Sequence, residues 1–373
     1  MGAGQGAVEE LLTPDPAFWQ GKRVFLTGQT GFKGTWLALW LARLGAAVRG
    51  FALLPEETSD GRPPLHNAAG VADCIESLQG DIRDAEALRQ AMRGFAPDIV
   101  FHMAAQALVR RSYHDPVETF ATNVMGTAHV LEAVRACPSV RAVVVVTTDK
   151  CYENRERIWA YREDEPLGGR DPYSASKAGT ELVVAAWRAS FLEASGVAIA
   201  SARAGNVIAG GDWAGDRLLP DCIRALSAGR SIEIRSPRAT RPWQHVLEPL
   251  AGYLILAERL WQDGVKVAEA WNFGPAMADV KPVAHVVDRV TRLWGPGAAW
   301  HLTSEAGAPH EAGLLAVDPA KAQARLGWHP RLRLDGALDW AVRWYRDYLA
   351  GQQAGELIRR DIARYEAEGK AYP

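Results

Sequence analysis

A short apolar segment that runs directly into three evenly spaced glycines constrains this chain more than any other stretch. Residues 23–27 (RVFLT) predict a buried strand, residues 28–34 (GQTGFKG) follow at once, and the Trp- and Leu-rich residues 36–44 predict an apolar helix. Glycines in such a turn let backbone amides approach a pyrophosphate at the helix N-terminus, although G-x-x-G-x-x-G differs from the commoner G-x-G-x-x-G. The pattern predicts a dinucleotide site formed by Gly28, Thr30, Gly31, Phe32, Lys33 and Gly34.

Strands and helices continue to alternate along the first half of the chain. Further strands are predicted at residues 47–53, 98–102, 142–146 and 197–202, and helices at 117–136 and 173–195. This order predicts an α/β fold with a Rossmann-like, doubly wound parallel sheet and a smaller C-terminal α/β substrate lobe.

We expect three parts in the chain. Residues 20–203 form the nucleotide-binding domain, to which later segments return, residues 204–350 form mainly the substrate-binding lobe, and residues 351–373 form a C-terminal helical tail. The glycine-rich residues 203–213 predict a loop over the ligand crevice, and residues 334–349 and 355–368 predict surface helices.

Polar chemistry follows the central strand at the point where it ends. The β-branched run 142–146 leads into Thr147, Thr148, Asp149 and Lys150, and the ligand crevice of an open α/β sheet lies beyond the carboxyl ends of its strands. A helix beginning near residue 172 then carries Tyr173 and Lys177 four apart on one face. An ammonium beside a tyrosine stabilises its phenolate, so Lys177 is expected to lower the pKa of Tyr173.

Other stretches are candidates for the cofactor's remaining contacts. Asp81 follows a short strand-like stretch and is suited to accept a hydrogen bond from the adenine amino group. The small residues Ala104 and Ala105 follow the strand 98–102 and would let a cofactor lie against the backbone, although tight packing is an alternative reading. The strand at 47–53 does not end in the acid that usually reads NAD ribose, so the choice between NAD and NADP stays open. The predicted residues are Asp81, Ile82, Ala104, Ala105, Gln106, Asn123 and Thr147.

Composition excludes several classes of function. A net charge of −2 gives no basic field for nucleic acid, and no apolar run approaches the ~20 residues of a membrane span. The four cysteines and the histidines show no metal-binding spacing, so no metal is predicted. The acidic N-terminus does not resemble a signal peptide, and we expect a cytoplasmic protein.

Together these motifs resemble the extended branch of the short-chain dehydrogenase/reductases, which includes nucleotide-sugar epimerases, dehydratases and reductases. Within that branch, TGQTGFKGTWLALWL, TTDKCYEN, RAGNVIAGGDWAGDRLLPD and RPWQHVLEPLAGYL are similar to the CDP-glucose 4,6-dehydratase family. The most discriminating detail is Thr148-Asp149-Lys150, because the dTDP-glucose dehydratases carry Thr-Asp-Glu there and epimerases usually lack the pair. Ala209 departs from the family, which has glycine there.

The resemblance implies a reaction on CDP-glucose with bound NAD. It implies oxidation at C4, loss of water across C5 and C6 and return of hydride to C6, giving CDP-4-keto-6-deoxyglucose, a precursor of the deoxysugars of O-antigen and lipopolysaccharide. Tyr173 would be the base at C4, aligned by Thr148, and Asp149 the acid at C6. Lys177 would assist Tyr173 and also bond the nicotinamide ribose, so that both residues belong to the cofactor site as well. Lys150 would be the base at C5, with an ion pair to Asp149 as the alternative reading.

The diphosphate and sugar require cations and amides on rigid elements. A guanidinium can bridge two phosphate oxygens, and Trp243 either packs against the base or fills the interface between lobes. The predicted substrate-binding residues are Asn206, Arg217, Arg241, Trp243 and Asn272. The resemblance also implies a homodimer or dimer of dimers joined through the 117–136 and 173–195 helices.

Three alternatives remain open at this stage. The first is another nucleotide-sugar dehydratase, acting on a dTDP- or GDP-sugar. A 4-epimerase or ketoreductase would need neither Asp149 nor Lys150, and a non-catalytic NAD-sensing protein would need neither Tyr173 nor Lys177.

Overall fold

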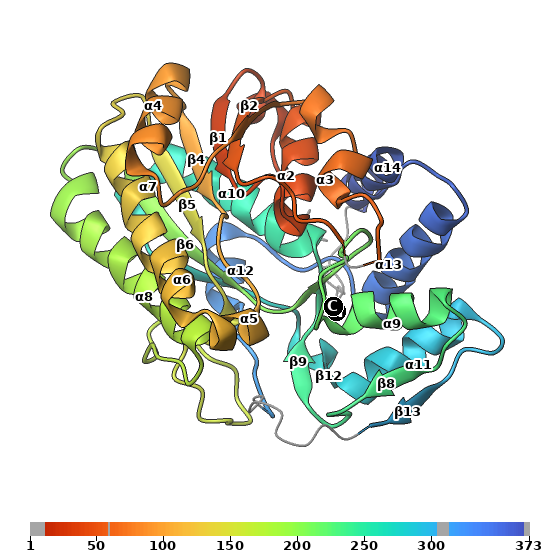
Figure 1. The fold of residues 1–373 in the computed structure, drawn as a ribbon. Helices are drawn as coiled ribbons and strands as arrows, with labels where there is room; N and C mark the ends of the chain where they lie inside the picture. The colour runs from red at the N-terminus through yellow and green to blue at the C-terminus, as the bar shows by residue number, and fades with distance from the viewer. Residues whose placement is uncertain (1–11, 59, 304–312, 369–373) are drawn as a thin grey trace, which may run out of the picture.

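A seven-stranded parallel sheet runs through the centre of the molecule (Figure 1) in the order β11-β6-β5-β4-β1-β2-β3. The structure is a computed structural model that describes residues 12–58, 60–303 and 313–368. Strand order reverses between β1 and β4, which is where open sheets of this kind bind ligands. The strands are β1 (Arg23–Thr27), β2 (Ala47–Ala52), β3 (Glu76–Gln79), β4 (Ile99–His102), β5 (Ala142–Val146), β6 (Ala198–Ala204) and β11 (Ala270–Phe273). The predicted doubly wound parallel sheet is confirmed.

Helices cover both faces of this sheet because side chains alternate along each strand. In β1, Phe25 belongs to one apolar cluster, whereas Val24 and Leu26 belong to the other. The Phe25 face is covered by α4 (Ala85–Phe95), α7 (Gly126–Arg135) and α8 (Pro172–Trp187), and the opposite face by α2 (Phe32–Arg43) and α10 (Leu247–Asp263).

A smaller lobe lies beyond the C-terminal edge of the sheet (Figure 1). It contains α9 (Leu218–Ser227), α11 (Val283–Trp294) and three two-stranded pairs: β7 (Val207–Ile208) with β10 (Gln244–His245), β8 (Ile232–Ile234) with β13 (Trp300–Leu302), and β9 (Thr240–Pro242) with β12 (Val280–Pro282). The other elements are α1 (Pro16–Trp19), α3 (Leu65–Ala68), η1 (Val71–Asp73), α5 (Val109–His114), α6 (Pro116–Phe120), η2 (Ala121–Met125), η3 (Asp149–Cys151), η4 (Arg188–Leu192), η5 (Gly264–Val267), η6 (Met277–Asp279), α12 (Ala320–Leu326), α13 (Leu334–Leu349) and α14 (Ala354–Ala367).

Several helix predictions were wrong in part. The helix expected over 117–136 is interrupted by the π-helical segment η2, where the inward-pointing Asn123 bonds to other segments, and α8 also ends in a π-helical segment, η4. The helices α13 and α14 are more than surface helices, because they bury Trp344, Tyr345 and Tyr365 completely or nearly so. Tyr365 packs edge-on against Trp40 of α2, with ring centroids 5.7 Å apart.

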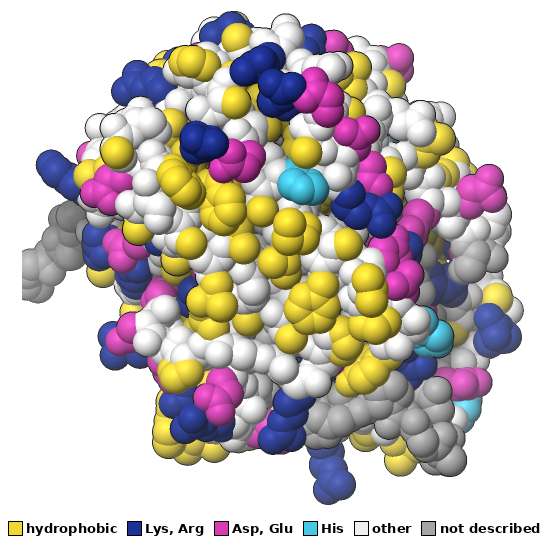
Figure 2. Space-filling model, turned by 60° about the vertical axis from the view of Figure 1, so that its left-hand side comes forward, with side chains coloured by type: hydrophobic (Ala, Val, Ile, Leu, Met, Phe, Trp, Pro, Cys, Tyr) yellow, Lys and Arg dark blue, Asp and Glu magenta, His cyan; other side chains and the backbone are white. Residues whose placement is uncertain are grey.

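One face of the molecule exposes a group of large apolar side chains. Figure 2 shows hydrophobic side chains gathered across the middle of this face, with most charged side chains around them. We call the exposed residues of α6, η2, α8 and η4 the helical patch. It comprises Val117 (78% exposed), Phe120, Met125, Leu182 (63% exposed) and Phe191.

Candidate functional site

A cleft of about 1320 Å³ follows the C-terminal ends of β1, β4 and β5 and continues into the smaller lobe. It contains 21 of the 23 residues predicted from the sequence to bind or react, and the exceptions are Asn123 and Asn272. Both catalytic segments and the glycine turn therefore meet in one space, as the ends of neighbouring parallel strands should.

The glycine turn leaves no room for side chains where it crosses the strand ends. Gly28 has a φ of 81°, and a Cβ on it would lie 2.7 Å from the backbone nitrogen of Ala104. A Cβ on Gly34 would lie 2.0 Å from the carbonyl oxygen of Gly28. The helix α2 starts here behind Gly31, which offers no side-chain cap, so its first amides can bind an anion. The turn fits the pyrophosphate of a dinucleotide.

Lys33 extends from this turn toward the centre of the cleft. Its Nζ donates to the hydroxyl of the buried Tyr253 over 3.4 Å. Burial, together with the nearby charges of Arg217 and Lys177, lowers the pKa of Lys33 to about 7.

The opposite end of the cleft contains Asp81 and Ile82 as predicted. The Asp81 carboxylate already accepts from the backbone amide and guanidinium of Arg83, which lowers its pKa. Arg49 of β2 points elsewhere, since it bonds Glu76 over 2.8 Å and the carbonyl of Ala91 over 3.1 Å. The acids that follow β2 and line the cleft are Glu56 and Glu57, which come only after Pro55.

Asp149 lies buried at the centre of the cleft, where β5 gives way to the short helix η3. Its side chain is 1% exposed, and burial raises its pKa above the usual value despite the nearby Lys150, Arg241 and Lys33. Thr148 donates to Oδ1 over 2.9 Å, whereas Oδ2 has no hydrogen-bond partner among the described residues. A buried carboxyl with one free oxygen and a raised pKa is suited to give up a proton.

Tyr173 and Lys177 lie beside Asp149 on α8. Burial raises the pKa of Tyr173 to about 12, and a hydrogen bond with Thr148 acts in the opposite direction. The expected net lowering by Lys177 is therefore not found, and Lys177 instead donates to the carbonyl of Val146 over 3.2 Å. The Nζ of Lys150 lies 5.9 Å from the centroid of the Tyr173 ring, so this side chain is directed into the cleft.

Four predicted substrate residues, Asn206, Arg217, Arg241 and Trp243, line the part of the cleft formed with the smaller lobe. Arg217 is paired with Asp212 over 2.8 Å, which raises its pKa, and Arg241 donates to the carbonyl of Thr240. The indole Nε1 of Trp243 is buried with no partner among the described residues. Two guanidinium groups at this end provide the positive charge that a diphosphate needs.

Asn123 and Asn272 do not line the cleft, so the prediction that they contact ligands does not fit their positions. Asn123 bonds both the amide and the carbonyl of Gln106 and the hydroxyl of Ser176, and thereby joins η2 to α8. Asn272 accepts from Tyr152 over 2.7 Å and donates to the carbonyls of Tyr161 and Asp318. Their amide groups are occupied within the packed protein.

Sequence reasoning missed Glu181, a buried carboxylate directly behind the chemical centre. It accepts from Thr147 over 2.5 Å and from Arg203 over 2.9 Å. The available signal was its position four residues after Lys177, which places both charges on one side of α8.

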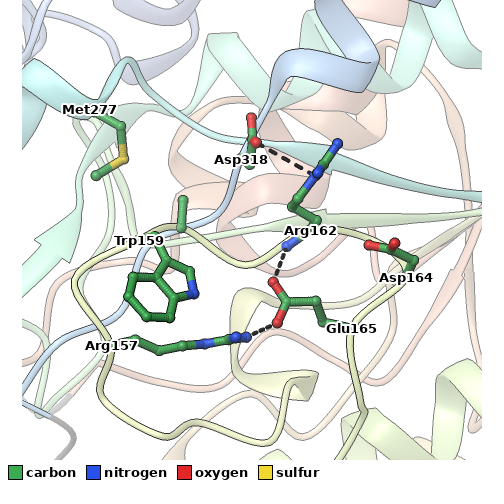
Figure 3. Close-up of a pocket in the computed structure, with 8 residues that line it drawn as sticks. Arg157, Trp159, Arg162, Asp164, Glu165, Met277 and Asp318 are labelled. Atoms are coloured by element: carbon green, nitrogen blue, oxygen red, sulfur yellow. Dashed lines mark hydrogen bonds and ion pairs between the residues drawn. The ribbon is translucent and has the colours of Figure 1, made fainter.

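A smaller hollow of about 570 Å³ lies outside this cleft, and its charged side chains largely satisfy one another (Figure 3). Arg157 pairs with Glu165, and Arg162 lies 3.9 Å from Asp318. It contains none of the predicted residues. In the described part of the chain, no cluster of three His, Cys, Asp or Glu is placed to hold a metal ion.

The parallel sheet, the glycine turn and the Tyr173/Lys177 pair define the class, the extended short-chain dehydrogenase/reductases. Solved structures of both epimerases and dehydratases share the fold. The UDP-glucose 4-epimerase of Thermus thermophilus, a complex with NAD, has a TM-score of 0.74 and 24% identity over 87% of this chain and 99% of its own. The dTDP-glucose 4,6-dehydratase of Bacillus anthracis, also with NAD, has a TM-score of 0.72 and 20% identity over 89% and 98%.

Sequence comparison narrows the class to one family. Residues 25–339 match the family model described as GDP-mannose 4,6 dehydratase, and the chain belongs to this family. The CDP-glucose 4,6-dehydratase of Salmonella typhimurium is 51% identical over 356 residues, covering 94% of this chain and 98% of that protein.

Proposed function

We propose that this protein is a CDP-glucose 4,6-dehydratase, a lyase that uses bound NAD. The observation that carries the proposal is the buried, pKa-raised carboxyl of Asp149 beside Tyr173, in a chain 51% identical to an enzyme of that activity. A 4-epimerase does not need an acid at C6, so Asp149 argues against that reaction even though epimerases share the fold. NAD is the dinucleotide bound in the related dehydratase and epimerase structures.

Three proton-handling groups perform the reaction in this scheme. Tyr173 removes the proton of the C4 hydroxyl with Thr148 beside it, and Lys177 on the same side of α8 assists Tyr173 and would bond the nicotinamide ribose of NAD. Asp149 gives its proton to the departing C6 hydroxyl, and Lys150 removes the proton from C5 once C4 is a ketone. Bound NAD would supply the reversible hydride chemistry that oxidation at C4 and reduction at C6 require. Water leaves with the C6 oxygen, Lys150 returns its proton to C5 when hydride adds at C6, and the proton taken by Tyr173 restores Asp149 through solvent, so the balance requires no further oxidant.

The chain's own residues hold both ligands at fixed positions. The amides behind Gly31 bind the pyrophosphate of NAD, and Asp81 and Ile82 lie where its adenine end would be held. Arg217 and Arg241 bind the diphosphate of the sugar nucleotide, with Asn206 and Trp243 beside them.

Product mass decides the proposal directly. The protein is incubated with NAD and, separately, CDP-, dTDP-, UDP- and GDP-glucose, and the products are weighed. We expect CDP-glucose to lose the mass of one water and the other substrates to react much more slowly. Unchanged mass with inverted C4 would identify an epimerase, preference for another base would identify a different dehydratase, and no turnover would leave a binding protein.

We also infer that two copies join through the helical patch. Its apolar side chains are exposed on two neighbouring helical segments, and an exposed apolar group of this kind commonly marks an interface. Light scattering after gel filtration should give twice the chain mass of 40.6 kDa. Leu182→Glu should give a monomer, whereas Ile158→Glu, which changes an 80% exposed residue outside the patch, should not. A monomeric parent protein would refute the inference.

No helix in the described part of the chain has the length and apolar character to cross a membrane. Action in the cytoplasm stays a prediction from the N-terminal sequence, and supply of lipopolysaccharide deoxysugars stays a prediction from the family resemblance.

A further inference from the structure

The carboxylate of Glu181 lies within α8, 4% exposed, in the interior between the helix and the sheet. Three side chains donate to it: Thr147 Oγ1 to Oε1 over 2.5 Å, Ser201 Oγ to Oε2 over 2.7 Å and Arg203 Nη2 to Oε2 over 2.9 Å. Burial acts to raise the pKa of Glu181, but the charge of Arg203, assisted by these hydrogen bonds, lowers it and keeps the carboxylate ionised. A fixed negative charge therefore lies one helical turn from Lys177.

Two successive residues at the end of β5 are tied to two successive turns of α8. The carbonyl of Val146 accepts from Lys177 over 3.2 Å, and the hydroxyl of Thr147 donates to Glu181. The backbone amide of Thr147 also donates to the carbonyl of Ala202 in β6. The next residues along the chain are Thr148 and Asp149, so these ties set where the reacting segment leaves the sheet.

Glu181 is also the main counter-charge of Lys177. Burial lowers the pKa of Lys177 to about 8, and Glu181 is the largest influence acting against that lowering. His102 of β4, whose pKa burial lowers to about 3, is neutral and contributes no charge at working pH. The other titratable or charged groups within reach of Lys177 or Glu181 are Lys33, Cys151, Arg188 and Arg203.

We propose that Glu181 is a positioning residue of the dehydratase: it keeps Lys177 charged and holds Thr147, and with it the reacting segment, against α8. The proposal rests on the function proposed above for what Lys177 does, but not on the identity of the sugar nucleotide. The alternative is that Glu181 serves the fold alone, as the buried partner of Arg203, whose side chain is also only 4% exposed.

The variant Glu181→Gln separates the two readings, because it removes the charge and nearly preserves the shape. NAD binding is followed by quenching of tryptophan fluorescence as a function of pH, and turnover is measured in parallel. Without the carboxylate, Lys177 loses its proton at lower pH. NAD affinity and turnover each decline at alkaline pH, and we call this part of the pH profile the alkaline limb. In Glu181→Gln we expect the midpoint of the alkaline limb to lie about one pH unit or more below that of the parent. At pH 8 this amounts to a loss of about fivefold or more, with a much smaller loss at pH 6.

Two further variants serve as rescue and control. Glu181→Asp keeps the charge, so its alkaline limb should stay within about half a pH unit of the parent, with turnover reduced by the longer reach to Thr147. Ser201→Ala removes a donor to the same carboxylate from β6, outside the cleft, and should leave both the limb and turnover close to the parent. If Glu181→Gln does not fold, the double variant Glu181→Gln/Arg203→Met removes both buried charges and should show the same early loss.

A folded Glu181→Gln protein, or a folded double variant, whose binding of NAD has the parent's pH dependence would overturn the proposal and leave Glu181 a structural partner of Arg203. Equal displacement of the limb in Ser201→Ala would overturn it as well, since that variant keeps the charge. Because the NAD titration contains no sugar nucleotide, it measures the effect of Glu181 on NAD binding even if the proposed substrate proves to be wrong.

Discussion

Replacing Asp149 by Asn removes a proton while keeping nearly everything else at the centre of the cleft. The amide oxygen of Asn can take the place of Oδ1, which accepts from Thr148 over 2.9 Å. The amide nitrogen takes the place of Oδ2, a buried atom without a hydrogen-bond partner among the described residues. The change therefore tests proton donation rather than packing.

The expected loss follows from the role of a general acid. Such a group contributes about a hundredfold to ten-thousandfold, which corresponds to about 3 to 5 kcal/mol of activation free energy. The substitution should affect the free energy of unfolding differently from turnover. Burial raises the pKa of Asp149, so the folded state binds its proton more tightly than the unfolded state, and the folded protein loses stability as pH rises above the unfolded pKa. Asn does not ionise, so the Tm of the variant should fall less than the parent's as pH rises from acid to neutral.

The assay separates the two halves of the reaction. Oxidation at C4 does not need Asp149, whereas loss of the C6 hydroxyl does. Mixing the variant with NAD and CDP-glucose should therefore produce the near-ultraviolet absorbance of reduced nicotinamide, with little product lighter by one water. Turnover within a few-fold of the parent would refute the assignment, and a variant that neither reduces NAD nor binds it would mean that the substitution damaged the site.

Three further predictions test other parts of the molecule. Tyr173→Phe should lower turnover by about a hundredfold or more and leave NAD affinity within a few-fold, as measured by fluorescence quenching; a near-normal rate would exclude Tyr173 as the base. Gly34→Ala places a Cβ 2.0 Å from the carbonyl oxygen of Gly28 and should weaken NAD binding at least about tenfold, whereas Gly336→Ala in α13, with no atom within 4 Å of the added carbon, should bind normally. Glu258→Gln tests pH linkage: burial raises the pKa of Glu258 from 4.5 to about 7, so the parent should lose up to about 3 kcal/mol of unfolding free energy as pH rises between those values. Gln can keep both hydrogen bonds, which Glu258 accepts through Oε1. The free energy of unfolding in urea should therefore depend less on pH in this variant than in the parent. An equal dependence on pH would mean that a group other than Glu258 titrates in this range.

Local sequence patterns predicted most of the fold and most of the cleft. The glycine turn, the end of β5 and the Tyr173/Lys177 pair each combine a periodic apolar element with polar residues at its end. Such patterns are complete within a short stretch, and the rule that parallel strands end at one edge then brings them together. For this reason the residues near these three segments were placed in the cleft correctly.

The residues that sequence reasoning misplaced depend on partners from distant segments. Asn272 and Asn123 have the chemistry of ligand-binding amides, but their hydrogen bonds go to residues 120 and 17 positions away, respectively. The sign of the Tyr173 pKa shift depends on burial by the folded protein, which a four-residue spacing does not report. Glu181 was missed for the same reason, since its three donors lie on β5 and β6.

The position of β11 at the edge of the main sheet has a consequence during synthesis. Strand β6 is complete at residue 204, but the strand that pairs with its free side ends only at residue 273. Helix α10, which covers β5 and β6, also emerges late. While the ribosome adds those roughly seventy residues, the nascent chain presents an unpaired strand and an uncovered apolar face, the features from which aggregates grow. Truncation before β11 should therefore yield insoluble protein rather than an independent nucleotide-binding fragment.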